Sequence, residues 1–308
     1  MRKILFALSA LALLAATAGA QSDWHPAPGH PTLKLWPSGA PGPDLANGPE
    51  HVQPDSPSHD IANRPVTLLA DVTVPTITLY AAPKAHNSGA AVVVFPGGGY
   101  QILAIDLEGT EVCAWLNSIG VNCVLLKYRV PDTGPYPKSA EALEDAQRAM
   151  GLVREHAKAW HIDAERIGVL GFSAGGYLAA ALSTHDEDRL YPAVDAADLL
   201  SCKPNFELVI YPGYLAIAEK NFEFNPAIPV TAEVPPTFLV QAEDDPVHVE
   251  NVIDYFLALK KAGVAAELHV YTHGGHGYGL RRTELPITGW PKLADTWLHT
   301  IGVLKSAG

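Results

Sequence analysis

The stretch that most constrains the fold is residues 166–176, where a short apolar run leads into the motif Gly-Phe-Ser-Ala-Gly at 171–175. An alanine-rich segment of helical character, residues 177–182, follows immediately. A strand, a tight turn and a helix in direct succession raise the hydroxyl of Ser173 above the sheet, and the helix N-terminus favours negative charge beside it. The two glycines are needed because the strand and the helix approach too closely for side chains. This context predicts a nucleophilic serine, whereas a bare G-x-S-x-G pattern also occurs by chance.

Strands and helices alternate from residue 90 to the end of the chain. Apolar runs predict strands at 90–95, 121–130, 167–170, 206–211, 237–241 and 266–271, and apolar stripes at helical spacing predict helices at 107–119, 139–159, 177–182, 249–263 and 290–304. Ser139 is expected to cap the helix that it begins. The alternation predicts an α/β fold in which a mostly parallel sheet carries helices on both faces.

The first twenty residues have the pattern of an export signal. Arg2 and Lys3 form a basic head, residues 4–16 are apolar, and Ala-Gly-Ala at 18–20 is a cleavage site for signal peptidase. The apolar run is too short to span a membrane. We therefore expect residues 1–20 to be removed and the mature protein to be periplasmic or secreted.

The remaining chain divides into an arm and a domain. Residues 21–63 are rich in Pro, Gly and His, and we expect an N-terminal arm with a short edge strand at 33–36. Residues 64–308 contain no linker or internal repeat and are predicted to form one domain, with one or two further strands within 66–82. Residues 215–235 are broken by prolines and are expected to be an irregular excursion over the sheet.

The composition is that of an ordinary globular protein, with 48% hydrophobic and 18% charged residues. Acidic residues number 33 and basic residues 21, a balance that argues against nucleic acid or anionic lipid as a partner. A neutral substrate, such as an esterified sugar, fits better than a polyanion. No stretch after the signal peptide is long and apolar enough to cross a membrane.

The three cysteines, Cys113, Cys123 and Cys202, are too few for a disulfide framework. Cys113 and Cys123 are close enough in sequence for a bridge, which export would permit, and burial as two small apolar residues is equally compatible. There is no C-x-x-C pair, and the scattered histidines of the arm are expected to be solvated. The sequence therefore predicts no metal site.

Several predicted strands end in residues suited to catalysis, and the carboxyl ends of strands meet at one edge of an open α/β sheet. Ser173 follows one strand, Asp245 a later strand and His276 the last strand. An imidazole can take the proton of a serine hydroxyl near neutral pH, and a buried carboxylate holds the imidazole in the required tautomer. We predict Ser173 as nucleophile, His276 as general base and acid, and Asp245 as the orienting acid.

A further strand end, at residues 96–100, contains three consecutive glycines. Glycines there can bring bare backbone N–H groups close to the oxyanion of a tetrahedral intermediate. We predict Gly98, Gly99 and Ala174, which follows the nucleophile, as the oxyanion donors. Tyr100, Tyr214 and Tyr278 are candidates for lining an acyl or sugar pocket and are equally compatible with packing inside the protein.

Two of these assignments have competing neighbours. His273 precedes His276, which we prefer because glycine flanks it on both sides and suits an open loop. Asp244 and Glu243 compete with Asp245, which directly precedes a proline and the next helix. The sequence leaves the choice between Asp245 and Asp244 open. The two histidines are not expected to bind a metal, because the pattern supplies no third ligand.

With these residues in place, the chain resembles α/β-hydrolases of the acetyl esterase/lipase type over residues 65–305. More narrowly, it is similar to secreted bacterial esterases grouped with acetylxylan and other carbohydrate esterases. Five motifs carry the resemblance: Phe-Pro-Gly-Gly-Gly-Tyr at 95–100, Cys-Val-Leu-Leu-Lys-Tyr-Arg-Val-Pro at 123–131, Gly-Phe-Ser-Ala-Gly-Gly at 171–176, Asp-Asp-Pro at 244–246 and Gly-Gly-His-Gly at 274–277. Two positions depart from it, because Pro96 replaces a His of the hormone-sensitive-lipase-like relatives and His248 replaces a common Pro of the acid loop.

The resemblance implies an α/β-hydrolase fold and a serine esterase that removes short acyl groups, chiefly acetyl, from plant polysaccharide such as xylan. It implies no cofactor, and the partner is an acylated carbohydrate or another small ester. The paired carboxylates of a glycosidase are not identifiable in the sequence. The expected reaction is therefore cleavage of an ester and not of the glycan.

Two other functions are compatible with part of the pattern. Exopeptidases of the prolyl-oligopeptidase type share the Gly-x-Ser-x-Gly-Gly elbow, although no propeller domain is evident in the sequence. A non-catalytic binding module could also use a hydrolase scaffold. The presence of all three residue types of a serine–histidine–acid triad disfavours this last hypothesis.

Overall fold

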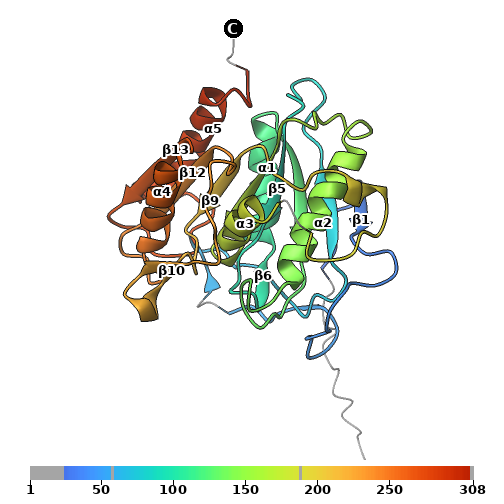
Figure 1. Cartoon of the computed structure of the whole chain (residues 1–308), viewed down its shortest axis with the longest axis horizontal. Coiled ribbons are helices and arrows are strands. Elements are labelled where there is room, and N and C mark those ends of the chain that lie inside the picture. Colours follow the sequence, from blue (N-terminus) through green and yellow to red (C-terminus); the bar gives the residue numbers. More distant parts are fainter. Residues whose placement is uncertain (1–23, 57–58, 187–188, 306–308) are drawn as a thin grey trace, which may run out of the picture.

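The computed structural model describes residues 24–56, 59–186 and 189–305, so the predicted signal peptide lies outside the described residues. Its centre is an eight-stranded sheet in the order β1-β4-β7-β5-β8-β9-β12-β13 (Figure 1). In that order the strands are Thr32–Lys34, Thr76–Tyr80, Asn122–Lys127, Ala91–Phe95, Ile167–Phe172, Glu207–Ile210, Thr237–Ala242 and Ala266–Tyr271. Strand β4 is antiparallel to both neighbours, and every other pair is parallel. The predicted mostly parallel sheet is confirmed.

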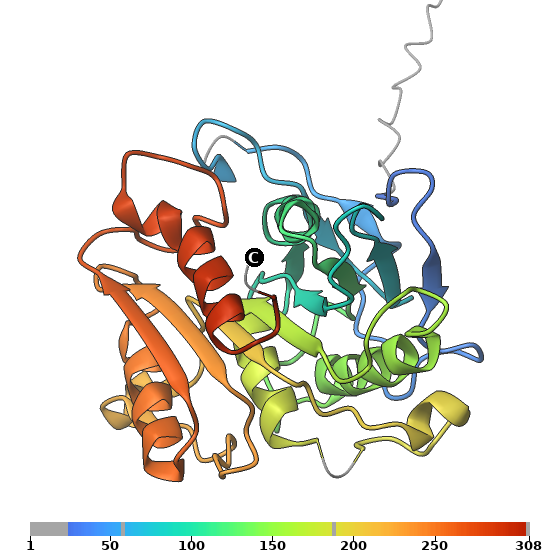
Figure 2. The ribbon, with the colours of Figure 1, turned by 90° about the horizontal axis from the view of Figure 1, so that it is seen from above.

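Helices cover both faces of this sheet, as Figure 2 shows, with α1 and α5 on one face and α2, α3 and α4 on the other. Their bounds are Glu111–Ser118 for α1, Glu141–His156 for α2, Ala174–Thr184 for α3, Glu250–Ala262 for α4 and Trp290–Thr300 for α5. Short 3-10 helices lie at Ala196–Leu199, Ala218–Lys220 and Pro286–Gly289. None of the described helices is long and apolar enough to cross a bilayer.

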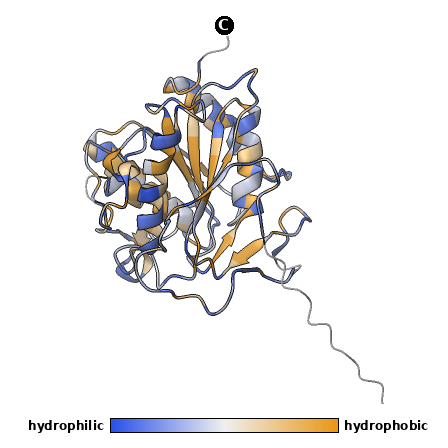
Figure 3. Cartoon of the chain, turned by 90° about the vertical axis from the view of Figure 1, so that its right-hand side faces the viewer, coloured by the Kyte–Doolittle hydropathy of each residue, from blue (hydrophilic) through white to orange (hydrophobic). Residues whose placement is uncertain are grey.

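The core lies between the sheet and the two helical layers. Every residue of the central strands β5 and β8 is buried, as expected for parallel strands covered on both faces. The strands are mostly hydrophobic, while the helices carry hydrophilic residues as well (Figure 3). The indole of Trp290 packs on Phe172 and on Trp115, with ring centroids 6.0 and 5.4 Å away. This contact fixes α5 and α1 over β8, the strand that leads to Ser173.

The N-terminal arm is built into the domain. Strand β1 forms the sheet edge at Thr32–Lys34, close to the predicted 33–36. A separate three-stranded sheet joins β2 (His51–Val52), β3 (Leu68–Ala70) and β6 (Ile102–Ala104), all antiparallel. Trp36 is buried and donates its indole N–H to Asp145 over 2.7 Å. The arm therefore contributes to the core and to the loop region beyond β5.

Three local predictions are corrected or resolved. Helix 107–119 begins with a π-helical turn, Asp106–Thr110, before α1. The cap predicted at Ser139 is wrong, because α2 starts at Glu141 and the Ser139 hydroxyl bonds the Glu141 side chain. Residues 215–235 contain a small hairpin of β10 (Ala216–Ile217) and β11 (Glu223–Phe224).

The cysteine alternative is also resolved. Cys113 of α1 and Cys123 of β7 form a disulfide across a sequence separation of 10 residues. The bridge fastens the helix that follows the glycine loop to the strand beside β5.

Candidate active site

Ser173 stands at a strained turn between β8 and α3. Its backbone has φ 52° and ψ −118°, a region that non-glycine residues seldom adopt. A Cβ at Gly171 would lie 1.9 Å from the carbonyl oxygen of Gly175, and a Cβ at Gly175 would lie 2.1 Å from that of Phe95. Both glycines are therefore sterically required, and the strain is held in place by the surrounding strand and helix.

Ser173, His276 and Asp245 form a continuous chain of hydrogen bonds. The hydroxyl of Ser173 is 2.8 Å from Nε2 of His276, and Nδ1 of His276 is 2.9 Å from Oδ2 of Asp245. The carboxylate of Asp245 is fully buried and also accepts from the side chain of Gln241 and the backbone N–H of Val247. These contacts fix the orientation of the carboxylate toward the imidazole.

The neighbouring carboxylate, Asp244, points elsewhere. It accepts from the backbone N–H groups of Gly274 and Gly275 at 2.9 and 2.8 Å and lies 3.2 Å from Nδ1 of His273. The hydrogen bond from Gly275 is the main cause that lowers the pKa of Asp244, and His273 contributes to the same shift. Asp244 therefore holds the loop before His276, while Asp245 reaches the imidazole itself.

The glycine loop after β5 supplies free backbone donors beside Ser173. Among the described residues, the N–H groups of Gly98 and Gly99 have no hydrogen-bond acceptor, whereas that of Gly97 donates to Glu108 over 2.7 Å. Gly98 has φ 138°, and a Cβ there would lie 2.0 Å from the carbonyl oxygen of Ile102. Ala174 begins α3, where N–H groups lack intrahelical acceptors.

A cavity of about 280 Å³ opens in front of these groups. Its apolar lining comes from Ile61, Val66, Leu68, Ala104 and Leu107. Its remaining lining comes from the backbone of three glycines and from four polar side chains: Gly98, Gly99, Gly277, His59, Glu108, Ser173 and His276. Much of the apolar wall thus belongs to the segment around β3, which the sequence had placed only as arm and strand. The cavity combines a reactive polar side with a wall suited to a small acyl group.

The three tyrosines predicted as substrate-binding candidates lie in different settings. Tyr214 is 41% exposed, and its hydroxyl lies 3.9 Å from the position of a Cβ on Gly99. Tyr100 is buried beneath it with a ring distance of 6.0 Å, and Tyr278 is buried against the ring of Tyr211 at 4.5 Å. Only Tyr214 keeps a place from which it can contact a ligand, and the other two pack inside the protein.

Two residues that the sequence analysis did not single out, Glu108 and Tyr211, also belong to the site. The buried carboxylate of Glu108 accepts from Gly97 and from the hydroxyl of Tyr211, the latter over 2.8 Å. Burial raises the pKa of Glu108, while the hydrogen bonds from Tyr211 and Gly97 oppose this shift. Glu108 falls four residues before Val112, on the apolar stripe of the predicted helix. An acidic residue on the apolar face of a predicted helix was therefore the sequence signal that could have identified Glu108.

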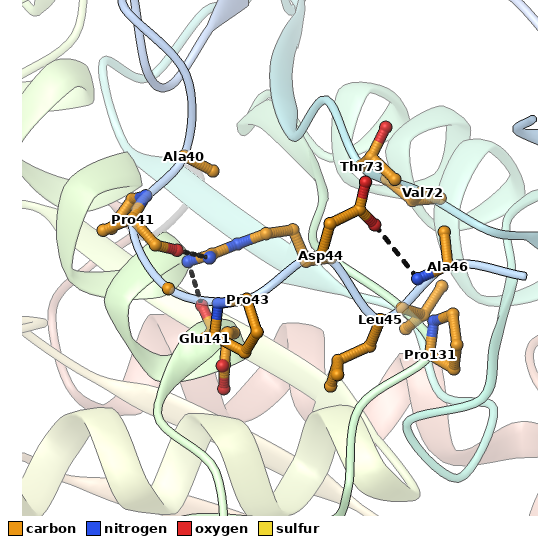
Figure 4. A pocket seen from close by; sticks show the side chains of 13 residues that line it. Ala40, Pro41, Pro43, Asp44, Leu45, Ala46, Val72, Thr73, Pro131 and Glu141 are labelled. Carbon is orange, nitrogen blue, oxygen red and sulfur yellow. Dashed lines mark hydrogen bonds between the residues drawn. The ribbon is translucent and has the colours of Figure 1, made fainter.

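A second cavity, of about 250 Å³, lies beyond the end of β7 and contains no residue of the hydrogen-bonded chain (Figure 4). It is lined by residues 40–46, 72–73, 129–131 and 141. Arg129 pairs with Glu144 at 3.0 Å and Asp145 at 2.9 Å, and it also donates to the carbonyl oxygens of Pro41 and Glu141. Its charge is therefore matched within the protein.

No group of three or more His, Cys, Asp and Glu side chains within the described part of the chain is arranged to hold a metal ion. The chemistry available at the first cavity is that of a serine hydroxyl, an imidazole, a carboxylate and backbone donors. Such a set can form and cleave an acyl-serine.

Comparisons with known proteins place this site in a family. Residues 142–288 match the model of the prolyl oligopeptidase family. The crystal structure of an acetyl ester-xyloside bifunctional hydrolase from Caldicellulosiruptor lactoaceticus is 38% identical, with TM-score 0.66, covering 75% of this chain and 89% of that one. The chain therefore belongs to the α/β-hydrolases, in their branch of carboxylic-ester hydrolases.

Curated relatives point the same way. An acetylxylan esterase of Xylanibacter ruminicola is 29% identical over 242 residues, which are 70% of this chain and 45% of the relative. An ethyl acetate hydrolase of Pseudomonas putida is 28% identical, covering 66% of this chain and 70% of the relative. The chain spans less than half the length of the acetylxylan esterase, so that protein contains sequence with no counterpart here.

Proposed function

We propose that the protein is an exported serine esterase that removes acetyl and other short acyl groups from plant polysaccharide such as xylan. The observation that carries the proposal is the chain of hydrogen bonds from Asp245 through His276 to Ser173, at the mouth of a small cavity. The similarity to an acetylxylan esterase and to an acetyl ester-xyloside hydrolase supports the substrate class.

The proposed reaction begins when the oxygen of Ser173 attacks the ester carbonyl carbon while its proton passes to Nε2 of His276. The carbonyl oxygen becomes an oxyanion, which the N–H groups of Gly98, Gly99 and Ala174 stabilise. His276 then gives its proton to the leaving sugar hydroxyl, and an acyl-serine remains. Water, activated by His276, releases the acid and restores Ser173.

The shape of the site supports a short acyl group on a bulky alcohol. The apolar wall of Val66, Leu68 and Leu107 can receive a methyl or a slightly longer chain. Tyr214 is 41% exposed, and its hydroxyl lies 3.9 Å from the position of a Cβ on Gly99, close enough to the glycine loop to contact a bound sugar. We assign Tyr214 to the sugar side, whereas Tyr100 and Tyr278 support the site from within.

The substrate experiment compares acetate release from acetylated xylan by the wild type and by Ser173→Ala. Release by the wild type alone is the expected result. If the wild type hydrolyses p-nitrophenyl acetate but releases nothing from xylan, the serine mechanism stands and the polysaccharide assignment is wrong.

The family name also leaves a peptidase as a second candidate, because the matched family model is that of prolyl oligopeptidase. A panel of dipeptide anilides separates the two activities, and we expect no turnover of any of them. A non-catalytic role predicts that a fluorophosphonate does not label Ser173, whereas the proposed mechanism predicts stoichiometric labelling.

Export is tested on the mature protein. N-terminal sequencing after expression in a Gram-negative host is expected to begin at Gln21, in the periplasmic or culture fraction. A cytoplasmic protein that retains residues 1–20 would contradict this part of the proposal.

A further inference from the structure

A buried carboxylate beside the catalytic cavity has no role in the mechanism above. Glu108 is 3% exposed and lines the cavity together with Ser173 and His276. Within the described residues it forms no ion pair with Lys or Arg. Burial of an anion without a cation is costly unless other groups satisfy it, so its partners deserve a functional explanation.

The partners of Glu108 belong to two different loops of the site. Oε2 accepts the N–H of Gly97, and Oε1 accepts the hydroxyl of Tyr211. The oxygen of Tyr211 in turn accepts the N–H of Gly279 over 3.0 Å, in the loop that carries His276. Since Gly279 donates to Tyr211, the phenolic proton is left for Glu108. Both partners are then donors, an arrangement that suits an ionised carboxylate.

The contact with Gly97 fixes the loop that holds the unpartnered donors. A Cβ at Gly97 would lie 2.7 Å from Oε2 of Glu108 and 2.8 Å from Cβ of Ser173, so this glycine is wedged between the two. Its N–H is taken up by Glu108, and those of the next two residues remain available. Glu108 thus determines which N–H groups of the glycine loop can face a substrate.

The contact with Tyr211 extends the connection to the imidazole. The ring of Tyr211 packs edge-on against His276, with centroids 5.0 Å apart, and against Phe172, the residue before Ser173, at 5.5 Å. Tyr211 has φ 37°, a strained backbone for a tyrosine. Strain of this kind is maintained where the surroundings require one exact placement.

We propose that Glu108 is a positioning residue of the esterase, whose carboxylate joins the glycine loop to the His276 loop through Tyr211 and stabilises the imidazolium formed during catalysis. This inference rests on the proposed function. The titratable groups that face the carboxylate are His276, Tyr211, Tyr278 and Tyr128 from other elements and Asp106 from its own turn. His276 is the one of these that becomes a cation in the reaction.

The test uses p-nitrophenyl acetate and the variants Glu108→Gln, Tyr211→Phe and the double variant. Loss of fixed geometry is expected to lower kcat of Glu108→Gln by about 10- to 100-fold with little change in KM. Removal of the negative charge disfavours the imidazolium, so the acid limb of the kcat/KM profile is expected to shift to lower pH. Tyr211→Phe should lower kcat less and leave the charge in place, and the double variant should be no worse than Glu108→Gln.

Glu207→Gln is the matched control. Glu207 is also a buried carboxylate that, among residues 24–56, 59–186 and 189–305, pairs with no Lys or Arg. It is held by hydroxyls of Ser183, Thr237 and Tyr255, but it lies at the opposite end of the strands. Its replacement is expected to lower stability without shifting the pH profile. The same shift in Glu207→Gln as in Glu108→Gln would overturn the proposal, because the effect would then be a general one of the fold.

Other outcomes separate this proposal from the function on which it rests. Wild-type kcat and an unshifted acid limb in folded Glu108→Gln would refute the positioning role alone. If Glu108→Gln does not fold, Tyr211→Phe alone becomes the test, and a wild-type kcat in that folded variant would refute the positioning role. No hydrolysis and no fluorophosphonate labelling of Ser173 in the wild type would instead refute the esterase function.

Discussion

Two cavities lie beyond the ends of the neighbouring strands β5 and β7, and the buried carboxylates near them have different kinds of partner. Around Arg129, the carboxylates of Glu144 and Asp145 face a guanidinium at 3.0 and 2.9 Å. Beside the cavity at Ser173, Asp245 bonds His276 and two neutral donors, and within the described residues Glu108 bonds the neutral donors Gly97 and Tyr211. In the first cluster both carboxylates pair with a cation, and the cluster ties the N-terminal arm to α2. The second leaves negative charge that can act on His276.

The position of a buried carboxylate along the strands affects its expected role as much as the kind of partner it has. Glu207 accepts from three hydroxyls and pairs with no Lys or Arg in the described part of the chain, yet it lies at the amino end of β9, opposite to the end that leads to Ser173. The partners of Asp245 and Glu108, by contrast, are themselves parts of the site. We therefore expect a buried carboxylate to contribute to catalysis when its neutral partners belong to the proposed reacting groups.

The sharpest way to break this comparison is to neutralise Asp245. In Asp245→Asn the imidazole loses its orienting acid and adopts the wrong tautomer, so kcat on p-nitrophenyl acetate is expected to fall about 10⁴-fold. The thermal midpoint should change little, because an amide keeps most of the hydrogen bonds. A loss of activity that merely follows a loss of folded protein would contradict the comparison.

The complementary experiment neutralises Asp145, which pairs with Arg129. Asp145→Asn leaves the Arg129 charge partly unpaired in a buried site, and the expected cost in free energy of unfolding is about 3–5 kcal/mol. Urea denaturation measures this cost. The kcat of the protein that remains folded should be near that of the wild type, and a large fall in kcat with stability unchanged would reverse the assignment of the two cavities.

The disulfide predicts a smaller and purely structural effect. Replacing Cys113 and Cys123 by Ser opens a short loop, and loop entropy predicts a loss of about 2–3 kcal/mol of unfolding free energy. Activity per folded molecule should persist, since the bridge lies behind the catalytic loops. Unchanged denaturant stability of the double variant would show that the bridge contributes little.

The smallest effect is expected at Asp244, the immediate neighbour of Asp245. Asp244 is exposed and braces the loop through Gly274 and Gly275. Asp244→Asn can still accept from one of the two N–H groups, so kcat is expected to fall by less than about threefold. A fall comparable to that of Asp245→Asn would mean that the two carboxylates share the triad role.

The sequence predicts those parts of the fold and of the site that depend on residues close together in the chain. The elbow around Ser173 and the alternation of strands and helices depend on neighbours in the chain, so the fold and the order of the strand ends were predictable. Whether Asp244 or Asp245 faces His276 was not, because adjacent residues of one turn point in different directions. Which of the two carboxylates reaches the imidazole is decided by how the loops pack in the folded protein.

The remaining features of the site come from distant contacts. The apolar cavity wall around Leu68 depends on pairing between β3 and β6, which no local pattern marks. Glu108 looked like one residue of a helix, and its role depends on Gly97 and Tyr211, which lie 11 and 103 residues away. Tyr100 and Tyr278 follow catalytic loops in sequence but turn inward, a direction that residue type cannot reveal.

The most direct test of the account is the rate of p-nitrophenyl acetate hydrolysis by Ser173→Ala beside the wild type, with both proteins shown to be folded. Loss of the nucleophile is expected to lower kcat by about 10⁶-fold, close to the effect of removing the whole triad. Fluorophosphonate labelling should disappear in the same variant. Hydrolysis by folded Ser173→Ala at a rate near that of the wild type would contradict the account, because the reaction would then depend on another group.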